Sequence, residues 1–241
     1  MNFLNQFYST TEDGQVSVSG IQASGFAKNI AGDFNPIHDV DSRRFCVPGD
    51  LLFAIALNQY GLHQSMSFNF LSLINAETAL QFPTKQDGHL SGQLQQRQLQ
   101  VISTKPVLDI SYSGDCSNNQ STIEQLIRNY VAFSGQNFPD ILVPLMKQHN
   151  VMINPQRPLV IYESMTLEFD DLEFEKLSIN LEDTSLIVDG KRGNAKLHFS
   201  LNSESQVVGS GVKNLVLSGL REYEEDSIQQ MCDQYLASKK A

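Results

Sequence analysis

The sequence predicts an α+β fold made of two tandem repeats, each with a buried helix followed by antiparallel strands. Residues 51–57 are apolar on every side, which is typical of a helix that is buried all round. Strand-like runs follow this segment, and the same order of helix and then strands recurs in the second half of the chain. We therefore expect an N-terminal repeat over residues 1–119 and a C-terminal repeat over residues 120–241.

The N-terminal repeat is expected to begin with a short strand at 16–18 and a helix over 20–31. The apolar positions of that helix have helical spacing, and Gly32 suits its end. A long buried helix is expected at about 49–65, with Pro48 and Gly49 at its start. Strands are expected near residues 70–82, 90–102 and 106–113, with a Gln-Asp-Gly turn at residues 86–88.

The C-terminal repeat is expected to begin with a helix over 121–134. Ser121 and Glu124 have the spacing of a capping box, and Gly135 follows the last turn. A shorter buried helix is expected at about 141–150. Four strand-like runs follow, near residues 159–170, 174–182, 194–202 and 206–217.

An amphipathic helix is expected at the C-terminus of the chain. Its apolar residues follow the spacing of one helix face: Ile228, Met231, Cys232, Tyr235 and Leu236. Such a stripe usually docks on the body of its own protein, and binding to a separate partner is the alternative.

A short internal similarity supports a duplication. Residues 30–37 resemble residues 133–140, with a glycine and a proline four positions apart in both. The alternative is a chance resemblance between two short passages that lead from a helix to a strand. We favour two repeats packed edge to edge as a pseudo-dimer, and a homodimer of the whole chain is possible.

Composition limits the classes of partner. The formal net charge is −10 at pH 7, which argues against nucleic acid or an anionic membrane as the main partner. The three cysteines lie far apart with no CxxC pair, so we expect no metal site and no disulfide framework, and we expect no cofactor. No apolar run is long enough to span a membrane. These features predict a cytoplasmic protein.

The segment Gly-Asp-Phe-Asn-Pro-Ile-His at residues 32–38 carries the clearest chemical signal. Gly32 allows a sharp turn after the preceding helix, and Pro36 stiffens the loop. Asp33 and His38 are therefore held five residues apart on a rigid turn, where both side chains can act on one water molecule. Asn35 can hydrogen-bond either the loop or a ligand.

This segment resembles the signature of the MaoC-like, or R-specific, enoyl-CoA hydratases, Gly-Asp-x-Asn-Pro-[Leu/Ile/Val]-His, and matches it at all six specified positions. The resemblance implies a hot-dog fold, in which an antiparallel sheet wraps a central helix. It also implies that Asp33 and His38 are the catalytic pair and that the Gly49 N–H is the oxyanion donor. The substrate would be a thioester of CoA or of an acyl carrier protein. The chain also resembles a bacterial protein family of about this length.

The chain departs from the family pattern close to the motif. Arg44 stands where the family usually has a small residue, and Pro48-Gly49-Asp50 replaces the usual His-Gly before the central helix. Arg43 and Arg44 could be solvated or could bind the phosphates of CoA, and Pro48 would contact the substrate. Asp50 would repel an oxyanion unless it caps the helix instead.

The second repeat lacks the catalytic pair. Gln136 and either Asp140 or Ile141 stand where Asp33 and His38 would be, so this repeat is expected to supply pocket wall and a partner sheet. Three functions remain open. The first is hydration of an enoyl thioester or the reverse dehydration of a 3-hydroxyacyl thioester. The second is hydrolysis of an acyl-CoA by a hot-dog thioesterase, and the third is binding of acyl thioesters without catalysis.

Overall fold

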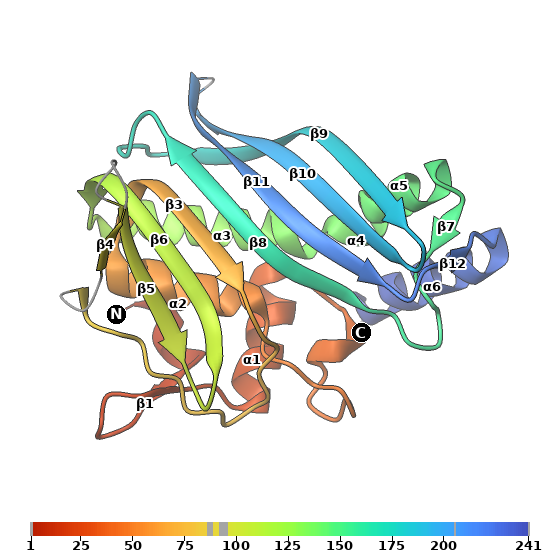
Figure 1. Cartoon of the computed structure of the whole chain (residues 1–241), viewed down its shortest axis with the longest axis horizontal. Coiled ribbons are helices and arrows are strands. Elements are labelled where there is room, and N and C mark those ends of the chain that lie inside the picture. The colour runs from red at the N-terminus through yellow and green to blue at the C-terminus, as the bar shows by residue number, and fades with distance from the viewer. Residues whose placement is uncertain (1, 86–88, 92–95, 205, 241) are drawn as a thin grey trace.

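The computed structural model describes residues 2–85, 89–91, 96–204 and 206–240, and one eight-stranded sheet dominates it (Figure 1). The order across the sheet is β4-β5-β6-β3-β8-β11-β10-β9, and every neighbouring pair is antiparallel. Its strands are β3 (Leu62–Phe70), β4 (His89–Ser91), β5 (Gln96–Ile102), β6 (Pro106–Ser117), β8 (Val160–Phe169), β9 (Leu177–Asp189), β10 (Arg192–Ser203) and β11 (Gln206–Ser218).

The two halves of the sheet have the same topology. From the centre of the sheet outward, the strands of each half are the first, fourth, third and second of that half in chain order. Strand β3 therefore corresponds to β8, and β6 corresponds to β11. The two first strands pair with each other from Ser65↔Glu168 to Asn69↔Ser164. The chain is therefore a double hot dog whose halves join edge to edge, which confirms the predicted fold class.

Helices cover one face of this sheet (Figure 1). They are α1 (Gly20–Phe26), which continues as the short π-helix η2 (Ala27–Ala31), α2 (Gly49–Tyr60), α3 (Gln120–Gly135), α4 (Asn137–Asp140), α5 (Leu142–Gln148) and α6 (Glu225–Ser238). The described residues also form short elements: η1 (Phe3–Gln6), β1 (Ser9–Thr10), β2 (Val16–Ser17), η3 (Pro36–His38), β7 (Val151–Met152) and β12 (Arg221–Glu222). Among the described residues, no helix is long and apolar enough to cross a membrane.

Helix α2 is the centre of the main core. Every residue from Leu51 to Leu57 is at most 2% exposed, which agrees with the apolar character of this segment on all sides. It packs with α3 and with inward-facing side chains of the N-terminal strands, such as Phe68 and Ile110. A second core lies under α5 and α6 against strands β9, β10 and β11.

Several predicted boundaries were wrong. The helix expected at 49–65 ends at Tyr60, because Gly61 has a φ of 80° and residues from 62 onward join β3. The strand expected at 70–82 is absent from the described structure, where only isolated bridges at Leu80 and Gln81 mark this stretch. Asn119, not Ser121, caps α3, since its side chain accepts from two backbone N–H groups of the first turn. The turn expected at 86–88 lies outside the described residues.

The C-terminal helix docks on the body of the chain. Ile228 and Tyr235 of α6 are buried, while Leu236 is 43% exposed and so is not part of the docked face. Figure 1 shows α6 beside β12 and the end of β11. This position brings the tail of the chain to the cavity described next.

Candidate functional site

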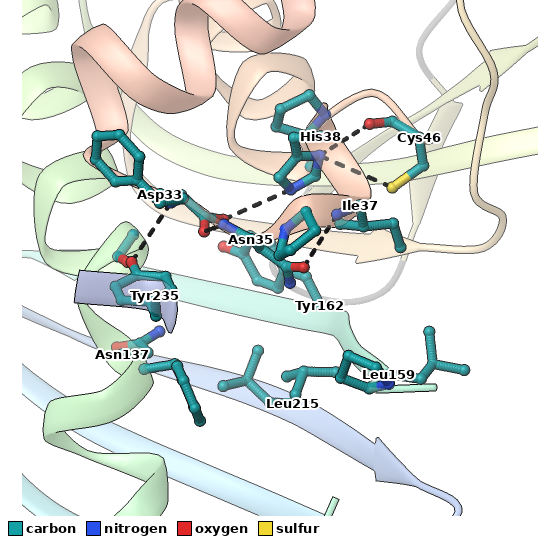
Figure 2. A pocket seen from close by; sticks show the side chains of 18 of the residues that line it. Asp33, Asn35, Ile37, His38, Cys46, Asn137, Leu159, Tyr162, Leu215 and Tyr235 are labelled. Atoms are coloured by element: carbon teal, nitrogen blue, oxygen red, sulfur yellow. Dashed lines mark hydrogen bonds and ion pairs between the residues drawn. The ribbon is translucent and has the colours of Figure 1, made fainter. Parts of the chain in front are cut away.

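A cavity of about 410 Å³ lies between the two halves of the chain (Figure 2). The first half contributes the loop at residues 33–38 and the start of α2, and the second half contributes the α3–α4 turn, β8, β11 and α6. Much of the lining is apolar, including Leu142, Ile153, Leu159, Val160, Leu215 and Met231.

The loop at residues 32–38 is held by its own side chains. Gly32 ends the helix with a φ of 65°, which glycine adopts without strain. Asp33 Oδ1 accepts a hydrogen bond from the Asn35 N–H at 2.9 Å, and Asn35 Oδ1 accepts one from the Ile37 N–H at 3.1 Å. Asn35 therefore caps η3. Of its two expected roles, a hydrogen bond within the loop or one to a ligand, its Oδ1 takes the first.

The loop brings Asp33 and His38 together on the cavity wall (Figure 2). His38 Nε2 lies 3.5 Å from Asp33 Oδ2, and His38 Nδ1 lies 2.9 Å from the carbonyl oxygen of Cys46. A carbonyl oxygen only accepts, so Nδ1 carries a proton and Nε2 faces the carboxylate. Burial disfavours the imidazolium, but hydrogen bonds to Asp33 and Cys46 outweigh this effect and raise the pKa of His38 to about 10.

We predict a pH-dependent contribution of His38 to stability. The folded-state pKa of about 10 lies above the ordinary value of 6.5, so the stabilisation is fully present below pH 6.5 and is lost as the pH rises through about 10. Its size should be on the order of a few kcal/mol. Urea unfolding of the wild type and of His38→Gln should give a difference in free energy that shrinks over this range. A difference that does not change with pH would contradict the raised pKa.

The start of α2 faces the same cavity. Gly49 is the first residue of α2, where backbone N–H groups have no partner within the helix and the helix dipole favours negative charge. A Cβ atom at Gly49 would lie 3.0 Å from the Tyr162 ring and 3.3 Å from the Phe70 ring, so a larger residue would crowd the wall. Pro48 also lines the cavity and is buried.

The two arginines are separated. Arg44 lines the cavity and is exposed, whereas Arg43 is exposed and lies outside the cavity lining. A ligand in the cavity would therefore meet Arg44 rather than the pair. Gln136 and Asp140 or Ile141, the residues of the second half that correspond to Asp33 and His38, are also outside the lining. The residues that this repeat contributes from the same stretch include Ser134 and Asn137.

The sequence interpretation missed a buried charged group beside the motif. Lys213 of β11 is 3% exposed, and its Nζ donates to Ser134 Oγ, which in turn donates to Asp50 Oδ2 at 2.5 Å. The carboxylate of Asp50 is thus directed to Ser134 instead of capping α2. Burial raises the pKa of Asp50 and lowers that of Lys213, and the attraction between the two charges opposes both shifts.

A signal for Lys213 was present in the strand pattern. Alternate residues of β11 face the helices, and this inward row reads Gly209, Gly211, Lys213, Leu215 and Leu217. A lysine in a row that is otherwise glycine or leucine indicates either a buried charge with a partner or a functional site. The second missed residue is Tyr235 of α6, whose hydroxyl donates to the Gly135 carbonyl at 3.0 Å and lies 3.3 Å from the Gly32 carbonyl.

Tyr235 links the two halves at the cavity. Its hydroxyl also accepts a hydrogen bond from the Phe34 N–H at 3.5 Å, so the tail helix contacts both the motif loop and the end of α3. Burial, followed by the negative charge of Asp33, raises the pKa of Tyr235 to about 12. In the described part of the chain, no group of three or more His, Cys, Asp and Glu residues could hold a metal ion.

The topology and the cavity between the halves define a protein of the double hot-dog class. Residues 2–226 match the family model described as "Protein of unknown function (DUF3581)", and the chain belongs to this family. No curated protein sequence matches the chain.

Three solved structures illustrate the similarity to known folds. A tesB protein of Mycobacterium avium subsp. paratuberculosis is 8% identical, with a TM-score of 0.48 over 89% of this chain and 97% of that one. The acyl-CoA thioesterase II TesB2 of Mycobacterium marinum is 12% identical, with a TM-score of 0.43 over 92% and 98%. A MaoC-like dehydratase of Phytophthora capsici is 14% identical, with a TM-score of 0.41 over 88% and 96%.

Proposed function

We propose that this protein is a MaoC-like hydratase that adds water to an enoyl thioester of CoA or of a carrier protein, or removes water from the 3-hydroxyacyl thioester. The observation that carries the proposal is the arrangement of three groups in one cavity. The Asp33 carboxylate and His38 Nε2 are 3.5 Å apart, and the N-terminal end of α2 at Gly49 lines the same wall. A base, an acid and an oxyanion donor are the three groups that hydration requires.

The reaction uses one water molecule held by Asp33 and His38. Asp33 takes a proton from the water while the oxygen forms a bond to C3 of the substrate. The electrons of the C2=C3 bond move to the thioester oxygen, where the Gly49 N–H and the helix dipole stabilise the negative charge. His38, protonated at neutral pH because of its raised pKa, gives a proton to C2. Both groups belong to one loop, so addition is expected on one face of the double bond.

The contact between Asp33 and His38 also allows their starting protonation states to be restored. After one turnover Asp33 holds the proton from water and His38 has lost its own. Transfer of that proton from Asp33 Oδ2 to His38 Nε2, 3.5 Å away, returns both groups to their starting state. No further proton donor is required.

The two repeats would then have different roles. The N-terminal repeat carries the reacting groups, and the C-terminal repeat supplies apolar wall, such as Leu159 and Leu215, for the acyl chain. Arg44, exposed at the cavity, would meet a phosphate of CoA or of the carrier protein's phosphopantetheine.

Hydrolysis of the thioester is a second candidate, and one feature of Asp50 favours it. Asp50 Oδ1 is buried and has no hydrogen-bond partner among the described residues, and Asp50 directly follows Gly49. Burial raises the pKa of this carboxyl group, which makes it a stronger base when ionised. A water held there could attack the thioester carbonyl instead of C3.

Two assays with crotonyl-CoA, run in parallel, separate the candidates. We expect the absorbance of the conjugated enoyl thioester to fall without release of free thiol, which means hydration. Thiol release would mean hydrolysis and would overturn the proposed function. If neither signal changes, the protein does not act on crotonyl-CoA, and longer enoyl chains would then decide whether it is a hydratase.

A further inference from the structure

The cavity wall contains an amide that the proposed hydration does not use. Asn137, at the start of α4, is 5% exposed and lines the cavity. Neither its Nδ2 nor its Oδ1 has a hydrogen-bond partner among the described residues. Figure 2 shows Asn137 in the part of the wall that also contains Tyr235 and Leu215.

Lys213 is a second group with unused hydrogen-bonding capacity. Its ammonium has three N–H donors. Within the described chain, Nζ donates a hydrogen bond to Ser134 Oγ. Nζ also lies 4.4 Å from the centroid of the Tyr162 ring. Lys213, Ser134 and Tyr162 all line the cavity.

Buried polar groups without partners destabilise the folded protein if their role is only structural. An unpaired buried amide destabilises the folded protein relative to one that is hydrogen-bonded, and a leucine of similar size would carry no such penalty. A buried polar group without a partner in the protein therefore calls for a partner from outside it. In this cavity that partner would be the bound ligand.

We propose that Asn137 and Lys213 bind a hydroxyl group on the acyl chain of the substrate, so that this protein acts on hydroxylated acyl thioesters. The identity of the ligand as a thioester rests on the proposed function. A hydroxyl group both donates and accepts, so it matches the acceptor Oδ1 and the donor Nδ2 of Asn137, and its oxygen can accept from Lys213.

The charges in the cavity favour a neutral group over a carboxylate. Lys213 is already matched by Asp50 through Ser134, and Asp33 is matched by His38. A substrate carboxylate would add an unmatched buried negative charge, which is costly. A plain alkyl chain would leave the Asn137 amide unpaired. A hydroxyl group avoids both costs.

The test is a binding comparison with saturated ligands, which cannot be hydrated. Hexanoyl-CoA and its isomers hydroxylated at C4, C5 or C6 are titrated into the wild-type protein by calorimetry. We expect at least one hydroxylated isomer to bind about tenfold more tightly or better than hexanoyl-CoA, since one buried hydrogen bond is worth that much. Equal binding of all four ligands would overturn the inference.

Two variants assign the preference to the named side chains. Asn137→Leu should abolish the preference for the hydroxylated isomer and should raise the midpoint of thermal unfolding, because it removes an unpaired buried amide. Lys213→Met should also abolish the preference. The matched controls are Asn129→Leu, whose amide donates to the Gln125 carbonyl in α3, and Lys196→Met on the exposed side of β10. Both controls should keep the preference.

The outcomes separate this inference from the proposed function. If Asn137→Leu lowers the thermal midpoint and keeps the preference, Asn137 is structural and the inference fails. Hydration of crotonyl-CoA without any hydroxyl preference would overturn the inference alone. A hydroxyl preference without hydration of any enoyl thioester would overturn the proposed function alone. If no CoA ester binds, the inference fails, because no hydroxyl preference is then observed.

Discussion

Replacing Asp33 by asparagine should reduce the rate of hydration by about 10² to 10⁴, the usual effect of losing a general base. The amide has nearly the same size as the carboxylate and can still accept from the Asn35 N–H, so the loop should keep its shape. It cannot take a proton from water. Steady-state turnover of crotonyl-CoA measures the loss, and calorimetry should show that acyl-CoA binding persists.

His38→Ala should cause a loss of similar size, because the two groups act on one water molecule. The double variant should therefore be little worse than either single variant, so the effects should be far from additive. His149→Ala, at an exposed histidine far from the motif in sequence, is the control and should be fully active. A wild-type protein that binds acyl-CoA but leaves enoyl and saturated thioesters unchanged would rule out an enzymatic role.

The fold was predictable because its main signals are local. A segment that is apolar on all sides favours a buried element over an exposed one, and α2 is too short to span a membrane. Three of the four long strands of the second half were placed well, since β8, β10 and β11 match their expected ranges within two residues. The strand expected near 174–182 is β9, which runs from Leu177 to Asp189. The stretch after β3 was misread because apolar residues such as Leu71 and Leu73 are exposed there.

The candidate site was predictable only where it lies within one loop. Asp33 and His38 are close in sequence, so the turn alone brings them together. Asp50, Ser134 and Lys213 belong to α2, α3 and β11, and their contact depends on how the two halves of the sheet meet. No local pattern contains that information. Tyr235 was assigned to a docking stripe, but its hydroxyl partners could not be read from helix spacing.

Replacing Gly135 by alanine tests how the two halves meet at the site. An added Cβ would lie 2.1 Å from the carbonyl oxygen of Ala31 and 2.8 Å from its carbon, and these backbone atoms cannot rotate away. We expect a destabilisation of about 1–3 kcal/mol, as is typical of overpacking, although alanine is favoured over glycine by ~1 kcal/mol inside an ordinary helix. Urea unfolding measures it.

Activity should fall further than stability alone would predict. The clash pushes against Ala31, two residues before Asp33, and a displacement of ~1 Å at a reacting group can cost ~10²-fold in rate. Gly25→Ala in α1 is the matched control, because its added Cβ would lie 3.9 Å from its nearest neighbours, Asn29 and Phe7. That variant should be as active as the wild type and no less stable. If Gly135→Ala behaves like Gly25→Ala, the end of α3 does not pack against the motif loop, and the C-terminal half cannot form the wall of this cavity as described.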